Sequence, residues 1–177
     1  MIDDLKSMIR SVKDFPKKGI IFRDITTLLK DPITLKRTSL LLFDFAKNKN
    51  ISKVVGVEAR GFMFGITLAE KLDVGFVPCR KPGKLPAETE KMTYELEYGK
   101  DSLEIHKDAI QKGDKVLLHD DLLATGGTAL AACKLIEKLG GQVVLASFII
   151  ELSFLKGRTK LKKYDVRALV DYDSESM

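Results

Sequence analysis

The stretch 116–129 constrains the fold of this chain more than any other part of the sequence. It starts as a short apolar run, Val116–Leu118, which is the pattern of a buried strand. The run ends at two adjacent carboxylates, Asp120 and Asp121, and a loop of small residues, 124–128, follows. Beyond the loop, apolar residues recur at helical spacing until a Gly-Gly pair. The stretch therefore predicts a strand, a loop and a helix.

The loop has the composition of an anion site. Backbone N–H groups at a helix N-terminus point outward and carry partial positive charge. Gly126 and Gly127 let the backbone close around a phosphate without Cβ clashes, while Thr125 and Thr128 add hydroxyl donors. The loop lacks the Gly-Lys-Ser/Thr of a Walker A motif and also differs from G-x-G-x-x-G. We therefore expect a phosphate site of another kind.

Asp120 and Asp121 distinguish this loop from an ordinary phosphate site, because acids repel a bare phosphate. They suit a ligand that also carries hydroxyls or a magnesium ion, and a phosphorylated sugar fits both the acids and the loop. The alternative is a strand end at which both acids are solvated and the glycines only make a turn. The spacing alone leaves both interpretations open.

The run Asp120–Thr128, Asp-Asp-Leu-Leu-Ala-Thr-Gly-Gly-Thr, resembles the phosphoribosyl pyrophosphate signature of the type I phosphoribosyltransferases, in the form that the adenine-specific members carry. The resemblance extends from about Phe15 to Arg158. It departs at His119, where the family usually has Val or Ile. It implies that phosphoribosyl pyrophosphate is bound by Asp120, Asp121, Ala124, Thr125, Gly126, Gly127 and Thr128.

A second segment, Phe22-Arg23-Asp24-Ile25-Thr26-Thr27, is similar to the family's adenine-binding stretch, with Thr27 in place of the usual Pro. Taken alone, Phe22 is a core residue and Arg23 a surface charge, because buried aromatic side chains mostly pack. The resemblance instead implies that Phe22 stacks on the purine ring, as an aromatic face suits a flat base. By the same resemblance the adenine-binding residues are Ile21 and Arg23 through their backbones, Phe22, and Leu152 on the second face of the ring.

Cations follow two other expected strands. Glu58–Phe62 comes after the buried run 53–57 and opens a helix, and ligands bind at this edge of open α/β sheets. Arg80 and Lys81 begin a basic loop with two prolines. Without the resemblance these are a helix cap, a surface ion pair and a solvated loop. With it, pyrophosphate is bound by Ala59, Arg60, Arg80 and Lys81, and Arg60 is also a catalytic residue because its fork donates twice to phosphate.

The segment 93–106 alternates as two strands across Gly99-Lys100-Asp101, which predicts a hairpin. The hairpin is either purely structural or a lid over the site. By resemblance it is the family's flexible catalytic loop, and Glu97 and Tyr98 fall on its catalytic positions.

Three further elements are predicted from pattern. Leu5, Met8, Ile9 and Val12 have the spacing of an amphipathic helix. Asp31-Pro32 starts a helix that runs to about Lys47, with Leu35, Leu42, Phe43, Phe45 and Ala46 on its buried side. The segment 165–170 is a last strand, and 171–177 is a polar tail.

Composition narrows the class of protein. The 177 residues are 45% hydrophobic and 31% charged, with a net charge of +5 and no basic stripe, so we expect no nucleic-acid partner. Cys79 and Cys133 form no C-x-x-C, which favours reduced thiols. We see no signal peptide and no membrane span, and expect a cytoplasmic protein without a membrane partner.

Strands alternate with helices, so we expect an α/β fold with a central, mostly parallel sheet flanked by helices. Residues 1–177 form one domain, with a small hood from the N-terminal segment and the region after Leu152. The resemblance implies that adenine and phosphoribosyl pyrophosphate give AMP and pyrophosphate, that Mg²⁺ is held mainly by the substrate with no predicted protein ligand, and that the chain is a homodimer. Two alternatives stay open: a phosphoribosyltransferase for another purine base, and a regulator that binds phosphoribosyl pyrophosphate without catalysis.

Overall fold

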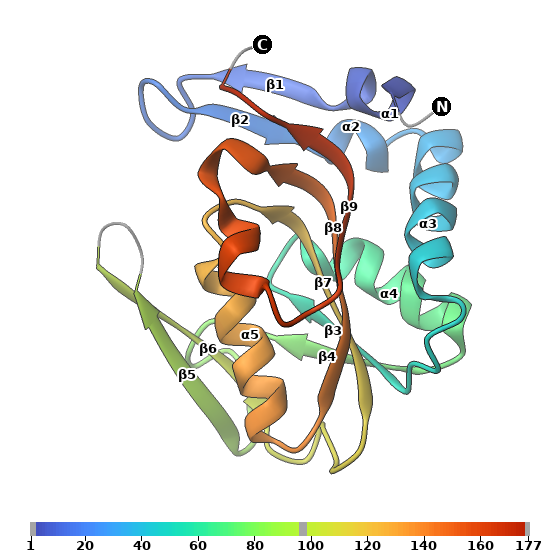
Figure 1. Cartoon of the computed structure of the whole chain (residues 1–177), viewed down its shortest axis with the longest axis vertical. Helices are drawn as coiled ribbons and strands as arrows, with labels where there is room; N and C mark the ends of the chain where they lie inside the picture. The colour runs from blue at the N-terminus through green and yellow to red at the C-terminus, as the bar shows by residue number, and fades with distance from the viewer. Residues whose placement is uncertain (1–2, 96–98, 176–177) are drawn as a thin grey trace.

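The structure, a computed structural model, describes residues 3–95 and 99–175. Its centre is a parallel sheet with the strand order β4–β3–β7–β8–β9 (Figure 1). The predicted α/β fold with a central parallel sheet is therefore confirmed. The strands are β3 (Lys53–Val57), β4 (Gly75–Cys79), β7 (Lys115–Leu123), β8 (Gln142–Leu152) and β9 (Val166–Tyr172).

Helices cover both faces of this sheet, so the strands are apolar on both sides. Along β7, Leu117 faces the layer of α3 (Pro32–Ala46) and α4 (Gly61–Leu72), while Leu118 faces α5 (Gly127–Lys138). Both leucines are fully buried. This two-sided burial explains why β7 reads as a continuous apolar run rather than an alternating one.

The N-terminal segment differs from its prediction. The expected helix is only α1 (Asp3–Met8), and Val12 lies in β1 (Arg10–Lys13), where it pairs with Phe22 of β2 (Ile21–Asp24). The helical spacing of the four apolar residues was misleading because pairing with β2 overrides it. The short helix α2 (Thr26–Leu29) follows, and the Asp24 carboxylate accepts a hydrogen bond from the Thr26 N–H at 2.9 Å, one residue before the N-cap Ile25.

These N-terminal elements lie across the carboxyl end of the sheet, above β8 and β9 in Figure 1. The short helices η1 (Ser153–Leu155) and η2 (Gly157–Leu161) come directly after β8. The hood expected from the N-terminal segment and the region after Leu152 corresponds to these parts.

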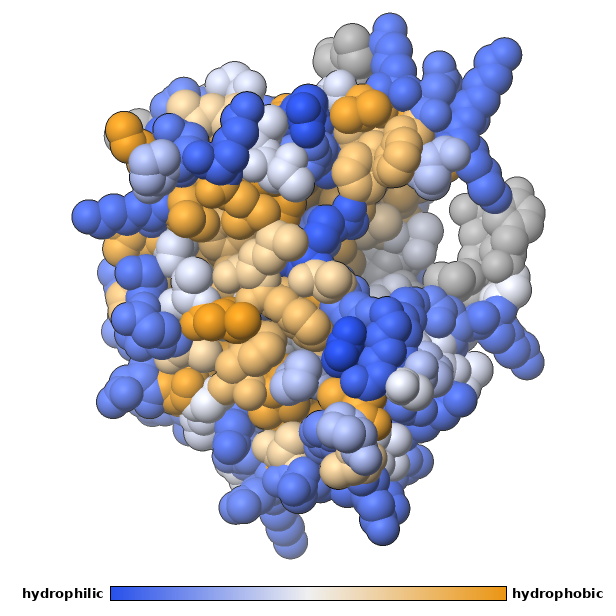
Figure 2. Space-filling model, turned by 180° about the vertical axis from the view of Figure 1, so that it is seen from behind, coloured by the Kyte–Doolittle hydropathy of each residue, from blue (hydrophilic) through white to orange (hydrophobic). Residues whose placement is uncertain are grey.

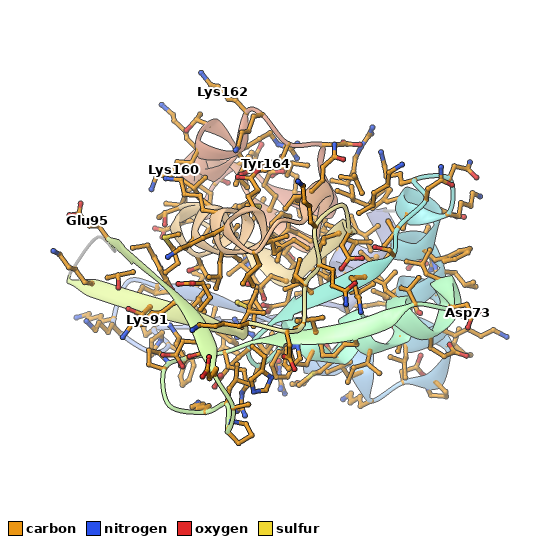
Figure 3. The ribbon with its side chains drawn as sticks, turned by 90° about the horizontal axis from the view of Figure 1, so that it is seen from below. Asp73, Lys91, Glu95, Lys160, Lys162 and Tyr164 are labelled. Carbon is orange, nitrogen blue, oxygen red and sulfur yellow. The ribbon has the colours of Figure 1, made fainter. Side chains whose placement is uncertain are left out.

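The predicted hairpin is present as β5 (Thr89–Glu95) and β6 (Lys100–His106), which pair in antiparallel register. Its bounds differ from the prediction: β5 begins before residue 93, and Lys100 and Asp101 are not in the turn because they pair with Glu95 and Tyr94. It leans on α5 and projects from the body of the molecule (Figure 1). Glu95 is exposed at the outer end of β5 (Figure 3). Glu97 and Tyr98, the predicted catalytic residues of this hairpin, lie outside the described residues.

The burial pattern of α3 and the end of the last strand differ in detail from their predictions. In α3, Leu42 and Ala46 are buried as expected, but its other fully buried positions are the small polar residues Thr34, Thr38 and Ser39, while Leu35, Phe43 and Phe45 are only partly buried. The last strand extends to Tyr172, which is buried, so the tail is polar only from Asp173. No helix among the described residues is long and apolar enough to cross a membrane.

Candidate active site

A polar cavity of about 490 Å³ opens at the carboxyl edge of the sheet, between the ends of β3 and β7 and the start of α5. The sequence predicted that ligand-binding side chains would meet at this edge. Of the eleven residues predicted to bind phosphoribosyl pyrophosphate, ten line this polar cavity: Ala59, Arg60, Lys81, Asp120, Asp121, Ala124, Thr125, Gly126, Gly127 and Thr128.

The loop 124–128 is held in one shape by close backbone packing. Gly126 has a positive φ of 77°, and a Cβ there would collide with the carbonyl oxygen of Gly157. A Cβ on Gly157 would in turn collide with the carbonyl oxygen of Ala124. The first helical N–H groups of α5, which starts at Gly127, therefore face the cavity from a fixed loop, as a phosphate site requires.

Asp120 and Asp121 are the most strongly perturbed acids of the cavity. Burial raises the pKa of Asp120, and the neighbouring Asp121 carboxylate raises it further. Burial also raises the pKa of Asp121, although the Arg60 guanidinium partly offsets this effect. Arg60 Nε lies 2.7 Å from Asp121 Oδ2, an ion pair without hydrogen-bond alignment. Two acids side by side, Asp121 buried and Asp120 partly buried, favour a ligand that donates hydrogen bonds, as ribose hydroxyls do.

Arg80, the eleventh predicted residue, lies beside the polar cavity rather than on its wall. Its Nε is 3.1 Å from Glu58 Oε2, and its Nη1 donates to the carbonyl oxygen of Lys84 at 3.1 Å. Burial opposes ionisation of Glu58, but hydrogen bonds from Lys84, the Lys81 N–H and Arg80 outweigh it and lower the pKa of Glu58. Glu58 is thus an anchor for the basic loop, a role that sequence reasoning missed.

The hairpin joins the polar cavity through a small network. Lys81 Nζ forms an ion pair with Asp101, and Tyr94 OH donates to Asp101 Oδ2 at 3.2 Å. The Thr128 hydroxyl donates to Tyr94 OH at 3.2 Å. Burial opposes ionisation of Asp101, but Lys81 outweighs it and lowers the pKa of Asp101. The end of the hairpin next to its turn therefore contacts both the phosphate loop, through Thr128, and Lys81, a residue predicted to bind pyrophosphate.

An apolar cavity of about 290 Å³ adjoins the polar one, and Leu122 and Ala124 line both. All four predicted adenine-binding residues lie on its wall: Ile21, Phe22, Arg23 and Leu152. The structure adds others that the sequence did not suggest: Ile20, Phe154, Leu155 and Glu175. β2 and the end of β8 thus bring one binding site together from both ends of the chain.

The burial of Phe22 and Arg23 is the opposite of what their residue types alone predict. Phe22 is partly exposed in the apolar cavity, with Arg60 Cζ 4.8 Å from its ring centroid and Phe15 packed edge-on at 5.2 Å. Arg23 is buried, with its Cζ 3.9 Å from the Tyr172 ring centroid. Phe22 therefore presents only part of its ring to the apolar cavity, and Arg23 packs within the hood.

Among the described residues, no three His, Cys, Asp or Glu side chains form a group that could hold a metal ion. His119 is buried in β7, with Nδ1 2.9 Å from Ser147 Oγ. Burial lowers the pKa of His119 to about 3, so it is neutral and belongs to the core.

The arrangement of the sheet, the phosphate loop and the paired acids is that of a phosphoribosyltransferase. A family model described as the phosphoribosyl transferase domain matches residues 26–173.

Whole-chain comparisons are more specific. The adenine phosphoribosyltransferase of Christiangramia forsetii is 59% identical over 169 residues, which cover 96% of this chain and 99% of that one. The crystal structure of adenine phosphoribosyltransferase from Thermoanaerobacter pseudethanolicus has 52% identity and a TM-score of 0.95, covering 97% of this chain and 100% of that one. The Saccharomyces cerevisiae structure has 44% identity and a TM-score of 0.88, covering 96% and 98%. The chain belongs to the adenine phosphoribosyltransferases, which act in purine salvage.

Proposed function

We propose that the two adjoining cavities hold the two substrates of the family reaction, phosphoribosyl pyrophosphate in the polar cavity and adenine in the apolar one. The observation that carries this assignment is their shared wall, Leu122 and Ala124. The two cavities meet at these residues. A base in one cavity and a sugar in the other would therefore have their reacting atoms adjacent, which supplies the proximity that the reaction needs. The Saccharomyces cerevisiae relative, whose structure is described as complexed with adenine and an imino-altritol bisphosphate, supports this placement.

The reaction forms a bond between adenine N9 and the anomeric carbon and breaks the bond from that carbon to the pyrophosphate oxygen. We assign the 5′-phosphate to the loop 124–128 and the ribose hydroxyls to Asp120 and Asp121. Arg60 and Lys81 stabilise the charge that develops on the departing pyrophosphate, with Arg80 adding to the local positive charge. The anomeric carbon carries oxocarbenium-like charge in the transition state, as in glycoside chemistry.

Magnesium fits this site as an ion held mainly by the substrate. Asp120 and Asp121 are the acids that could hold its bound waters, since oxygen donors suit this cation. When bound, the ion would neutralise pyrophosphate charge and so make it a better leaving group.

Proton removal from adenine N9 is assigned to Glu97, and Tyr98 is assigned to the lid that closes over the substrates. Both assignments come from the family resemblance. The described part of the hairpin lends indirect support, because Tyr94 contacts Thr128 on the wall of the polar cavity. A closed lid would also keep water from hydrolysing the sugar.

We also propose a homodimer. Large apolar side chains are exposed on α3 (Ile33 and Leu40) and α4 (Met63 and Ile66). Figure 2 shows hydrophobic side chains gathered on the face of the molecule that these helices cover. A patch of this kind on a small protein marks an interface. Ile66→Lys should shift the mass measured by light scattering from dimer to monomer, and an unchanged mass for wild type and variant would refute this interface.

The two cysteines fit a reducing compartment such as the cytoplasm. Cys79 and Cys133 are free and buried, so neither forms a disulfide in this structure.

A panel of bases tests the function. With phosphoribosyl pyrophosphate and Mg²⁺, pyrophosphate release should be fast with adenine and slow with hypoxanthine, guanine or xanthine. Fast release with hypoxanthine alone would indicate another purine specificity. Binding of phosphoribosyl pyrophosphate without release for any base would indicate a non-catalytic regulator.

A further inference from the structure

One charged group of the apolar cavity has no part in the mechanism above. Glu175 lines this cavity, and among its described lining residues it is the only acid. All the other lining side chains except Arg23 are uncharged. Arg23 is engaged elsewhere, because its guanidinium lies over the Tyr172 ring and donates to Ser11 Oγ. Among the residues that line this cavity, the charged group that a bound base would meet is therefore the Glu175 carboxylate.

The segment that carries Glu175 is held in place just before it. Tyr172 is in register with Leu152, and its carbonyl oxygen accepts a hydrogen bond from Ser153 Oγ at 3.3 Å. Lys6 Nζ donates to the carbonyl oxygen of Asp171 at 2.7 Å. These contacts fix the end of β9 beside Leu152, which is proposed to cover the base. Glu175 follows within three residues, so its approach to the cavity results from the strand pairing.

The position of Glu175 determines which edge of the base it meets. The base must present N9 toward the shared wall of Leu122 and Ala124, because the sugar lies beyond it. Glu175 lines the apolar cavity and is absent from the wall of the polar one. In this placement Glu175 lies away from N9, in the part of the cavity that the six-membered ring of the base would occupy.

We propose that Glu175 is a specificity residue that accepts a hydrogen bond from the 6-amino group of adenine. A carboxylate only accepts hydrogen bonds, and adenine presents an N–H donor at this position where hypoxanthine and guanine present an oxygen. The oxygen would repel the carboxylate, which is exposed to water at one side, and a site that uses an N–H donor disfavours an analogue that lacks it. This inference rests on the proposed placement of adenine in the apolar cavity.

The test compares Glu175→Gln with Asp173→Asn. Glutamine keeps the length of the side chain but can donate to a 6-oxygen. Asp173 lies on the same tail, is exposed, and does not line the cavity, so its variant is a matched charge control. In Glu175→Gln, kcat/KM for adenine should fall about tenfold while that for hypoxanthine stays or rises, since hydrogen bonds to charged groups carry differences of this size. Calorimetry should show the same change in the ratio of AMP to IMP affinity.

The outcomes separate the two proposals. A wild-type protein that makes no AMP would refute the proposed function itself. A wild type that makes AMP, together with a Glu175→Gln variant whose adenine-to-hypoxanthine ratio matches that of Asp173→Asn, would overturn only the role of Glu175. Equal losses for both bases would also overturn it, because they would show that the tail merely supports the hood.

Discussion

The two ends of the polar cavity, which we propose bind the two phosphate groups of the substrate, offer hydrogen-bond donors of different kinds. At the loop 124–128 the donors are backbone groups, and Gly126 and Gly157 fix their shape by contact. At the other end the donors are long cationic side chains, and each already has an acidic partner in the structure: Arg60 with Asp121 and Lys81 with Asp101. Arg80, beside the cavity, is likewise paired with Glu58. One end is preformed, while the other must exchange partners to bind its ligand.

This difference matches the fates of the two phosphate groups. The 5′-phosphate stays on the nucleotide and needs only a fixed position. The pyrophosphate must be stabilised as it leaves and then be released. Cations that can pair again with an internal acid lose less electrostatic stabilisation when pyrophosphate departs, because they are not left as unpaired charges beside a cavity. The acid partners therefore limit how tightly the product is held.

The largest effect should come from a residue at neither end. Both ends bind, but neither removes the proton from adenine. Glu97→Gln should lower kcat about 10²–10⁴-fold with little change in KM or stability, because it removes a general base while keeping size and hydrogen bonding. Single-turnover kinetics is the measurement, since slow product release could conceal a chemical defect.

Glu95 provides the control for this variant. It lies two residues away on the same hairpin and is exposed. Glu95→Gln should be much milder. A wild-type chemical rate in Glu97→Gln, or the larger defect in Glu95→Gln, would show that Glu97 is not the base.

The second effect separates the two ends directly. In the double variant Asp120→Asn and Asp121→Asn, affinity for phosphoribosyl pyrophosphate should fall about 10²-fold or more, because each hydrogen bond to a charged group contributes about 1.5–3 kcal/mol. Pyrophosphate alone should bind at least as well as to wild type, because Arg60 loses its internal partner. Calorimetric titrations measure both values, with Mg²⁺ for phosphoribosyl pyrophosphate and without Mg²⁺ for pyrophosphate, since the two acids could also hold waters of the bound ion. Wild-type affinity for phosphoribosyl pyrophosphate in a folded double variant would end this assignment.

The third effect concerns the strand that supports both acids. His119 has a folded pKa of about 3, below its unfolded value of about 6.5, so the unfolded chain binds the extra proton in between. This contribution to stability is therefore complete above the unfolded pKa and is lost as the pH falls below it. Between pH 7 and pH 5 wild type should lose ~2 kcal/mol from this group.

His119→Val removes that titration and should flatten the acid side of the stability curve measured by urea unfolding. Asp120 and Asp121 shift the curve in the opposite direction because their pKa values are raised, but both proteins keep them. The difference between the two curves therefore reports His119. Parallel curves from pH 7 to pH 5 would contradict the effect.

The smallest effect tests the exchange of partners. Asp101→Asn removes the internal partner of Lys81, so pyrophosphate should bind about two- to fivefold more tightly, the size expected for a solvent-accessible ion pair. Asp108→Asn changes the net charge equally but lies at the far end of the hairpin, in the exposed turn after β6. Equal tightening in both variants would indicate a general charge effect and refute the specific one.

The preformed end was predictable from sequence, and the exchanging end was predictable only in part. The loop 124–128 is contiguous, so its glycines and threonines can be recognised together in the sequence as a predicted phosphate loop. The cations Arg60, Arg80 and Lys81 follow strand ends, which places them at the correct edge of the sheet. Their acidic partners are another matter, because Asp101 reaches Lys81 only through the packing of the hairpin.

The hood was the least predictable part, for a physical reason. Val12 fits a helical stripe as well as a strand, and only its pairing with Phe22 decides between them. The sequence indicates a surface charge at Arg23, and only its packing against Tyr172, which is distant in the sequence, buries it. Glu175 likewise reaches the apolar cavity through pairing of β9 with β8. Contacts between segments distant in sequence carry no local signal.

The contact between Gly126 and Gly157 also limits how this chain can vary over evolution. The two residues lie in different segments, one in the phosphate loop and one just after η1, yet neither can gain a side chain while the other backbone stays in place. Relatives that share this fold should therefore keep glycine at both positions or change both together. An insertion between Leu152 and Gly157 would have to be absorbed before the second glycine. The segment from Leu152, which is proposed to cover the base, to Gly157, which packs on the phosphate loop, should accordingly have a fixed length.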